Sequence, residues 1–477
     1  MALRFTGTTS SGIIADSNND TWITYQTQNV SAAVDAVNFS TFDNIEYFLQ
    51  GHVFAGDGGI VAANGASNVD IVIGLGASIN AGVDGIELLC DSVADSSHDI
   101  VNHGTISAMA GEGVDVRARF SSLTNIGVIS AANFGVFFNG DSNDVINHGT
   151  IDAEATGILI DGDYGTIVNF GAMNALGTVG LDISGDFGTI KNFGTVVADS
   201  VAIDLGGSGR IANSGTANAG IGIRAISFVD ATTDAFRILN SGSVLAESYG
   251  VYLSGGAEDT FILRNSGEIR VQDVDGAAIL GSGSGDVIRN SGILEGNVRL
   301  GAGNDSYFGG EGTLLGLLDG GDGDDTLLGG QADDDMFGNS GGDTLTGRAG
   351  DDALNGGGGS DVLHGNRGDD TLLGGAGADW LSGGQDDDTL TGGSQPDRFV
   401  FIRNSGDDTI TDFENGLDKI DLTAFGLRTN LYGSVVAPAL IKAGPDVFLD
   451  LTALGGHGSI LIKDTAFNLI DGFDFIL

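Results

Sequence analysis

Short runs in which apolar and polar residues alternate recur along most of the chain. Between residues 51 and 300, two phrases carry this alternation. The first, Asn-x-Gly-x-apolar, begins at Asn102, Asn125, Asn147, Asn169, Asn192, Asn213, Asn240, Asn265 and Asn290. The second is a glycine followed by alternating apolar residues, and it occupies Gly113–Val116, Gly135–Phe138, Gly157–Ile160, Gly180–Ile183, Gly222–Ala225 and Gly250–Leu253. Each phrase is too short for a helix and has the period of two that is typical of a strand with one buried face.

The spacing of these phrases predicts how the strands stack. Successive asparagines of the first phrase are 21 to 27 residues apart, and a unit of that length cannot bury its apolar face by itself. Units must therefore stack, at about 4.8 Å per coil, into a parallel β-helix. The Asn and Gly of the phrase are expected at the corners of the coil with positive φ. Residues 1–50 break the pattern and are expected to cap the first coil with Trp22, Tyr25, Phe39, Phe42, Tyr47 and Phe48.

A tighter repeat of nine residues runs from Gly320 to Val400. Its first position is always glycine, its sixth always aspartate and its eighth always apolar, as in Leu327, Met336 and Phe399. The sixth-position residues are Asp325, Asp334, Asp343, Asp352, Asp361, Asp370, Asp379, Asp388 and Asp397. An earlier unit at Gly301 is one residue out of phase. Three columns in phase predict a second solenoid, in which two units complete one flattened turn and units i and i+2 lie above one another.

The charge of the chain changes what this second solenoid can be. The net charge is −46, and only 19 residues are Lys or Arg, which argues against nucleic acid as a partner because phosphate binding needs clustered basic residues. Residues 301–400 hold 20 Asp and Glu against three Arg. Without counterions such a segment repels itself, so a cationic partner is expected. No apolar run is long enough for a membrane span, and Cys90, the only cysteine, excludes an internal disulfide.

Stacked acidic corners indicate calcium sites in this segment. Paired carboxylates together with backbone carbonyls supply the oxygen-rich shell that Ca²⁺ prefers, whereas zinc would call for His and Cys. The predicted ligands are the nine sixth-position aspartates and the loop glycines Gly321, Gly323, Gly330, Gly341, Gly350, Gly359, Gly368 and Gly377. Pairing units i and i+2 gives up to about seven ions. The fourth position departs from glycine at Ala332, Asp386 and Gln395, which weakens the sites nearest those turns.

These repeats resemble those of the repeats-in-toxin (RTX) family, whose nonapeptide forms a calcium-binding β-roll. The following segment, from Asp397 to Leu422, resembles the C-terminal cap of serralysin-type proteases, and the ending Asp474-Phe-Ile-Leu477 resembles their acidic-then-apolar terminus. The resemblance implies type I secretion from a Gram-negative bacterium into the extracellular space. It does not extend to a zinc protease, because no His-Glu-x-x-His motif occurs. His103 and His148 share one slot of the Asn-x-Gly phrase and are expected to stack on the surface.

A β-helix followed by calcium repeats also resembles secreted mannuronan epimerases, and the coil length resembles that of pectate lyases. The residues expected to form one solvent-facing row are Glu87, Asp115, Phe137, Leu159, Asp182, Asp204, Arg224 and Tyr252. Asp182, Asp204 and Arg224 are weak catalytic candidates in this row. The Asp-Pro-His motif of the epimerases does not occur, and polar ladders are ordinary on a solenoid. The favoured hypothesis is therefore a non-catalytic surface, adhesive or scaffold module, and the alternative is a polysaccharide lyase or epimerase.

The predicted fold is all-β and has four parts. An N-terminal cap spans residues 1–50, a parallel β-helix 51–300, a calcium-binding β-roll 301–400, and a β-rich C-terminal cap with a secretion signal 401–477. The expected partners are calcium ions, a type I exporter and a cell-surface or matrix polysaccharide.

Overall fold

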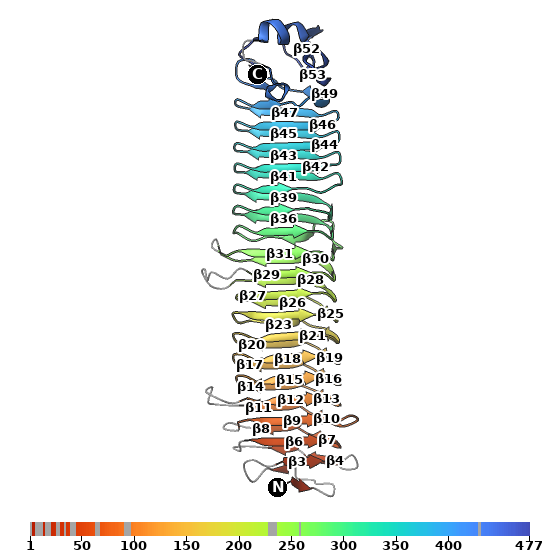
Figure 1. Ribbon diagram of the computed structural model, residues 1–477. Coiled ribbons are helices and arrows are strands. Elements are labelled where there is room, and N and C mark those ends of the chain that lie inside the picture. The colour runs from red at the N-terminus through yellow and green to blue at the C-terminus, as the bar shows by residue number, and fades with distance from the viewer. Residues whose placement is uncertain are drawn as a thin grey trace. The chain divides into compact units, whose positions relative to one another are not determined.

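The computed structural model describes residues 2–4, 13–14, 21–24, 29–32, 35–38, 44–62, 67–89, 97–227, 236–256, 259–427 and 431–477. Cys90 and the aromatic residues Tyr25, Phe39 and Phe42 lie outside these ranges. The chain divides into two compact units. One comprises Met1–Leu253 with Val271–Asp273, and the other comprises Ser254–Arg270 with Val274–Leu477. Both are built almost wholly from short parallel strands (Figure 1), so the prediction of an all-β parallel solenoid is confirmed.

In the first unit each coil contributes three strands, which form three columns of parallel strands. The first column consists of β1 (Ala2–Arg4), β3 (Thr21–Thr24), β6 (Ile45–Leu49), β9 (Val69–Ile73), β12 (Asp99–Asn102), β15 (Ser122–Asn125), β18 (Asp144–Asn147), β21 (Thr166–Asn169), β24 (Gly188–Asn192), β27 (Gly209–Asn213) and β29 (Phe236–Asn240). The second consists of β4 (Asn29–Ala32), β7 (His52–Ala55), β10 (Ser78–Ala81), β13 (Thr105–Ala108), β16 (Val128–Ala131), β19 (Thr150–Ala153), β22 (Ala172–Ala175) and β25 (Thr195–Ala198).

The third column consists of β2 (Ile13–Ile14), β5 (Val37–Asn38), β8 (Ile60–Ala62), β11 (Ile86–Leu89), β14 (Val114–Arg117), β17 (Val136–Asn139), β20 (Ile158–Asp161), β23 (Val179–Ile183) and β26 (Val201–Gly206). The long strand β28 (Thr216–Ile226) continues both columns, since its start pairs with β25 and its end with β26. The unit ends in β30 (Ser243–Ser254), all but its last residue. Strands β1, β3 and β6 pair in parallel with one another, so the columns reach back into residues 1–50. A capping role for that segment stays a prediction.

The alternation of the sequence explains the core of the first unit. Inward residues of successive coils, such as Ile106, Ile129 and Ile151, are fully buried and stack on one another. The phrase asparagines are buried as well. From Asn102 to Asn240, each amide Nδ2 but the last donates to Oδ1 of the next asparagine, for example from Asn125 to Asn147 at 2.8 Å. They do not adopt positive φ, so that expectation is wrong. The asparagines are needed because a ladder of amides satisfies polar groups inside the coil.

The second unit begins with three strands per coil and continues with two. Its first column consists of β31 (Phe261–Asn265), β34 (Val287–Asn290), β37 (Ser306–Phe308), β40 (Thr326–Leu328), β42 (Thr344–Ala349), β44 (Val362–Arg367), β46 (Trp380–Gln385), β48 (Arg398–Val400), β50 (Lys419–Asp421) and β54 (Phe475–Ile476). The middle column is short and holds only β32 (Glu268–Val271), β35 (Ile293–Glu295) and β38 (Thr313–Leu315) within the described residues. The last column consists of β33 (Ala277–Leu280), β36 (Asn297–Ala302), β39 (Leu317–Asp322), β41 (Asp335–Ser340), β43 (Ala353–Gly358), β45 (Thr371–Ala376), β47 (Thr389–Ser394), β49 (Asn404–Ile410) and β53 (His457–Ile462).

The change from three strands to two explains the degenerate stretch between Gly310 and Asp319. That stretch holds β38, the last strand of the middle column. From β40 to β48 each coil is two nonapeptides, and every eighth-position side chain from Leu327 to Phe399 is buried. The end of the chain closes this unit. Strands β51 (Leu440–Ala443), β52 (Asp446–Asp450) and β53 form an antiparallel sheet, accompanied by the short helices η1 (Thr423–Phe425), η2 (Tyr432–Val436), η3 (Ala437–Ala439) and η4 (Thr452–Leu454).

Among the residues that the structure describes, no helix has the length and apolar character required to cross a membrane.

Candidate metal sites

The sixth-position aspartates stack in two columns, one at each edge of the two-strand coils. The backbone N–H of one aspartate donates to Oδ1 of the aspartate one coil further on, as from Asp325 to Asp343 and from Asp352 to Asp370, both at 2.8 Å. The same bond joins Asp343 to Asp361, Asp361 to Asp379, Asp379 to Asp397, Asp334 to Asp352, and Asp370 to Asp388. The structure thus places all nine aspartates in the stacking pairs that the repeat predicts. Their role as metal ligands stays a prediction.

The other carboxylate oxygen of these aspartates is buried without a partner. In the described part of the chain, Oδ2 makes no hydrogen bond at Asp305, Asp325, Asp343, Asp352, Asp361, Asp370, Asp379, Asp388, Asp397 and Asp408. Removing a carboxylate oxygen from water without a compensating partner is costly. Partnerless oxygens aligned along both edges of the coil are the donor set that a hard divalent cation requires, so the residues present fit Ca²⁺.

Four aspartates outside the nine extend the columns, and the repeat did not identify them as ligands. The N–H of Asp286 donates to Asp305, and that of Asp305 donates to Asp325. At the far end, the N–H groups of Asp388 and Asp397 donate to Asp408 and Asp418. The sequence carries a signal for the first two, because Gly281-Ser-Gly-Ser-Gly-Asp286 and Gly301-Ala-Gly-Asn-Asp305 are partial copies of the nonapeptide turn. The pairs Asp305–Asp325 and Asp388–Asp408 come in addition to the seven predicted pairs, and Oδ2 of Asp305 and of Asp408 is partnerless as well.

Three of the four carboxylates at column ends differ from those inside. Asp334 Oδ2 accepts a bond from Gly330 N at 2.7 Å, and Asp418 Oδ2 accepts one from Glu414 N at 2.7 Å. Asp286 Oδ2 accepts from Ser282 N in the same way. Each of these carboxylates therefore closes its own loop, four residues back. Of the nine predicted aspartates, Asp334 is the least suited to give both oxygens to a cation, and Gly330, whose N–H it binds, is likewise engaged in closing the loop.

The loop glycines direct carbonyl oxygens into the gap between coils. A Cβ built on Gly377 would lie 1.3 Å from the carbonyl oxygen of Gly359, and one on Gly359 would lie 1.7 Å from that of Gly341. Both residues have positive φ, 143° and 141°. The predicted glycines Gly321, Gly323, Gly350 and Gly368 also have positive φ. Fourth-position carbonyls thus point along the column toward the next coil, as ligands shared between coils require.

Backbone carbonyls are needed because side chains alone do not complete a site. Within the described ranges, no three His, Cys, Asp or Glu side chains converge as a metal cluster. A cation at these positions would take carboxylate oxygens from the aspartate column and the rest of its shell from loop carbonyls. It would supply positive charge to a gap that is rich in oxygen acceptors.

Burial raises the pKa of the column aspartates. The pKa reaches about 8 at Asp305, about 7 at Asp352 and about 9 at Asp388, where the neighbouring Asp408 adds to the shift. Without a cation, Asp305 and Asp388 in the folded chain therefore favour the protonated form at neutral pH. A bound divalent ion acts in the opposite direction because it favours the charged carboxylate.

The row expected to face solvent is in register along the third column of the first unit, from Glu87 to Arg224. Parallel pairing places Glu87 beside Asp115, Leu159 beside Asp182, Asp182 beside Asp204, and Asp204 beside Arg224. The expectation that the row faces solvent is wrong for Asp115 and Asp204, which are 2% and 7% exposed. Arg224 binds Asp204 with both ends of its guanidinium group, Nε lying 3.0 Å from Oδ1. Burial and the charge of Asp204 raise the pKa of Asp182 to about 7.

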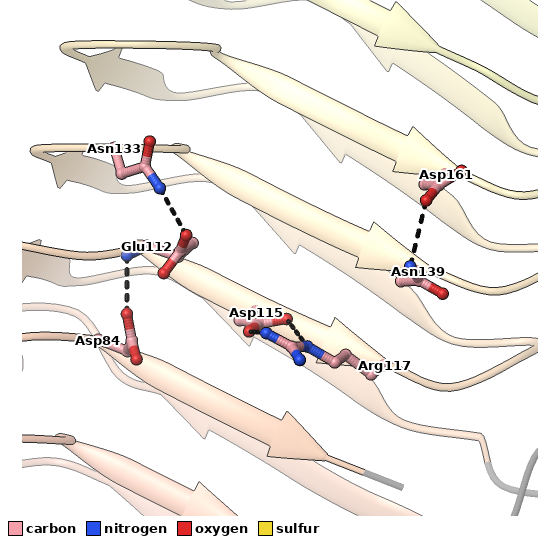
Figure 2. A network of polar contacts seen from close by, with 7 residues as sticks. All are labelled: Asp84, Glu112, Asp115, Arg117, Asn133, Asn139 and Asp161. Carbon is pink, nitrogen blue, oxygen red and sulfur yellow. Dashed lines mark hydrogen bonds and ion pairs between the residues drawn. The ribbon is translucent and has the colours of Figure 1, made fainter. Parts of the chain in front are cut away.

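Other polar side chains of this column bridge neighbouring coils (Figure 2). Asp84 Oδ1 accepts from the backbone N–H of Glu112 at 2.8 Å, and Asn133 donates to Glu112 Oε1 at 2.7 Å. Asp115 instead pairs with Arg117 on its own strand, at 3.0 Å. Burial raises the pKa of Glu87 to about 6. The hydrogen bonds of Asp84, Glu112 and Asn133 join coils, which is the usual structural use of polar ladders on a solenoid.

The two histidines of the Asn-x-Gly phrase do not stack on each other. Ile126 occupies the same slot in the coil between those of His103 and His148. His148 stacks on Phe170 with ring centroids 4.7 Å apart, and Phe170 stacks on Phe193 at 4.9 Å. The histidine slot is therefore part of a surface ladder of rings.

Comparison with protein families agrees with the geometry of the second unit. The RTX calcium-binding nonapeptide repeat matches residues 298–313, 317–345, 328–363, 337–372 and 364–399. Comparison of the chain with curated proteins finds no match. The matched segment contains all nine sixth-position aspartates and the change from three strands per coil to two. Residues 298–399 are thus calcium-binding repeats of the RTX type, and they continue a parallel β-solenoid.

Proposed function

We propose that this chain is an exported protein whose residues 301–477 fold when Ca²⁺ fills the two aspartate columns. The observation that carries the proposal is the set of ten buried, partnerless carboxylate oxygens. In a cytosol with little free Ca²⁺, the carboxylates repel one another and keep the segment open, which suits passage through a type I exporter. Outside the cell, millimolar Ca²⁺ binds only the folded form and stabilises it by mass action.

The burial of residues around β54 supports the same order, in which export comes before folding. Asp474 is 1% exposed and Phe475 is 8% exposed, and β54 pairs with β50. These two side chains are accessible in the open chain and covered in the folded one. We therefore place recognition by the exporter before folding, and the folded protein in the extracellular space, at the surface of a Gram-negative cell or free.

For residues 51–300 we propose a non-catalytic adhesive or scaffold role. Stacked aromatic rings at Phe170 and Phe193, each about half exposed, support a contact surface. The polar groups of the third column are largely engaged with one another, as in the Asp204–Arg224 pair. A polysaccharide of the cell surface or matrix is the partner that we favour.

The calcium switch is tested on the whole chain by limited proteolysis with and without Ca²⁺. We expect chelation to expose residues 301–477 to cleavage and Ca²⁺ to protect them. Asp352→Asn and Asp361→Asn each remove a charge from one column, so they should shift the Ca²⁺ midpoint of protection several-fold upward. Asp335→Asn is the matched control, because Asp335 is exposed on β41. Protection that is equally strong in excess chelator would refute the proposal.

A polysaccharide lyase or epimerase is the second candidate, and one observation favours it. Asp182 has a pKa raised to about 7 and lies beside the Asp204–Arg224 pair. Such a group can exchange a proton near neutral pH, as an acid or base catalyst must.

The enzyme alternative predicts turnover of alginate or pectate, with unsaturated product read by ultraviolet absorbance. A base at Asp182 would make the rate rise through pH of about 7, and Asp182→Asn would abolish turnover without loss of Ca²⁺-dependent protection. Leu159→Ala, on the neighbouring strand β20, serves as the packing control. The absence of product from all substrates would leave the non-catalytic role.

A further inference from the structure

A hollow of about 550 Å³ lies on the two-strand coils of the second unit. Its polar lining comes from Thr346, Arg348, Asn366, Arg367, Ser382 and Gln385, on β42, β44 and β46. Leu328 and Ile402 add apolar surface. We call this feature the Arg348–Arg367 hollow. Its volume is within the range of small-molecule sites.

The two arginines of the hollow are unusual in their surroundings. Residues 301–400 contain three Arg and no Lys against 20 acidic residues. The third, Arg398, binds Asp421. None of the ion pairs among the described residues involves Arg348 or Arg367. Two guanidinium groups without an acidic partner thus face one hollow on the most acidic part of the chain.

Strand register places these arginines on adjacent coils, one residue out of line with each other. Arg348 lies beside Asn366, and Ala349 beside Arg367, on adjacent coils. On the next coil Gly384 lies beside Asn366 and Gln385 beside Arg367. Arg348 Nη1 donates to the carbonyl oxygen of Gly310 at 3.1 Å, which anchors one end of its guanidinium group. Adjacent like charges repel, so the arrangement favours an anion between them.

The backbone conformation at Arg348 is a further observation about this hollow. Its φ is +89°, in the left-handed region that L-residues other than Asn and Asp seldom adopt. The same position of the repeat is glycine at Gly321, Gly330, Gly357, Gly375, Gly384 and Gly393. An arginine in a strained position that glycine would fill without strain is the kind of backbone outlier that occurs at binding sites.

We propose that the Arg348–Arg367 hollow binds an acidic saccharide, with its carboxylate or sulfate group between the two guanidinium groups. Arginine matches either oxyanion with paired hydrogen bonds. The hydroxyls of Thr346 and Ser382 and the amides of Asn366 and Gln385 suit sugar hydroxyls, and Leu328 and Ile402 suit the apolar face of a ring. This site lies in the calcium repeats and does not depend on the role proposed for residues 51–300.

The test measures binding of a trigalacturonate, a sulfated trisaccharide, a neutral trisaccharide and inorganic sulfate to the whole chain by calorimetry. Free Ca²⁺ is held at one saturating level throughout, because uronates themselves bind the ion. We expect at least one acidic trisaccharide to bind more tightly than the neutral one. Arg348→Gly and Arg367→Gln should each weaken that binding about tenfold or more, the loss of a charge-assisted pair.

Arg264→Gln removes the same charge from β31 and is the control. Arg348→Gly restores the repeat's usual residue, so its Ca²⁺-dependent protection and thermal midpoint should be unchanged or raised. This separates a failure of the saccharide site from a failure of calcium-dependent folding. Equal binding of the neutral trisaccharide, binding of inorganic sulfate as tight as that of the sugars, or unchanged binding by Arg348→Gly would overturn the proposal.

Discussion

A buried asparagine is the most informative single residue of the first unit. Asn147 is fully buried, accepts a bond from Asn125 at 2.8 Å and donates to Asn169 at 2.8 Å. Its amide therefore provides a hydrogen-bond partner to the asparagine on each of the two neighbouring coils. An aspartate or leucine of similar size would leave amide groups unpaired inside the coil.

Asn147→Ala should destabilise the coils around it by about 2–4 kcal/mol, because two buried amides each lose a partner. Hydrogen exchange of peptides from residues 120–175 at saturating Ca²⁺ measures the effect. Asn139→Ala is the control, since Asn139 is exposed and its bond to Asp161 is 3.2 Å long. A similar loss of protection in both variants would argue against the ladder as a source of stability.

The asparagine ladder also shows the limit of reading single residues from sequence. The spacing of the phrases identified the positions of these asparagines. It did not show that their amides lie inside the coil, and they were expected at corners with positive φ instead. Corners with positive φ do occur, at Phe120, Ser142, Tyr164 and Phe187, before the first strand of the coil. Sequence spacing gives register, whereas the direction of a polar side chain depends on how the coil closes.

At the scale of an element, the nonapeptide turn depends on close approach between coils. Gly359 has φ of +141°, and a Cβ there would lie 1.7 Å from the carbonyl oxygen of Gly341. The adjacent Gly358 has room, because its Cβ would meet only the carbonyl oxygen of Asn339 at 3.8 Å. Two neighbouring glycines are thus under different constraints.

Gly359→Ala should prevent Ca²⁺-dependent protection of residues 301–477, or raise the Ca²⁺ needed at least tenfold, because the turn must distort at a predicted ligand. Gly358→Ala should leave the Ca²⁺ midpoint within about twofold. Limited proteolysis against Ca²⁺ concentration measures both variants. Equal behaviour would mean that the tight turn plays no part in holding the ion.

The repeat predicted the aspartate columns well because its period is invariant. Nine units without a slip fix which aspartates lie above one another, and the bonds from Asp325 to Asp343 and beyond confirm that stacking. The ends of the columns were harder to predict. Asp408 and Asp418 lie in coils of irregular length, and the loop closure by Asp334 depends on a neighbouring coil that is not a nonapeptide.

For the molecule as a whole, the chain combines a large negative charge with few internal cations. The net charge is −46, and six ion pairs are formed among the described residues. Cohesion in the first unit comes from apolar columns and amide ladders. In the second unit the sequence and the structure both indicate carboxylates that an external cation could bind. The sequence could not indicate the Arg348–Arg367 hollow, because the hollow exists only when three coils are stacked.

Because each coil of the roll consists of two nonapeptides, the effect of a deletion should depend on its length. Deleting residues 356–373 removes one whole coil of 18 residues and keeps each later aspartate in its own column. Deleting residues 356–364 removes half a coil and transfers every later aspartate to the opposite edge, so that β48 and β49 meet the wrong neighbours. Ca²⁺-dependent protection should survive the first deletion and be lost in the second. Equal protection would contradict the two-column arrangement.

The same feature constrains how genes for such chains can change. Duplication or loss of DNA encoding nine residues would be disfavoured even though it preserves the motif, whereas steps of 54 nucleotides would lengthen or shorten the roll without disturbing its ends. The roll would then lengthen or shorten by two nonapeptides at a time. The number of complete nonapeptides between its two ends would therefore stay even or stay odd among related proteins.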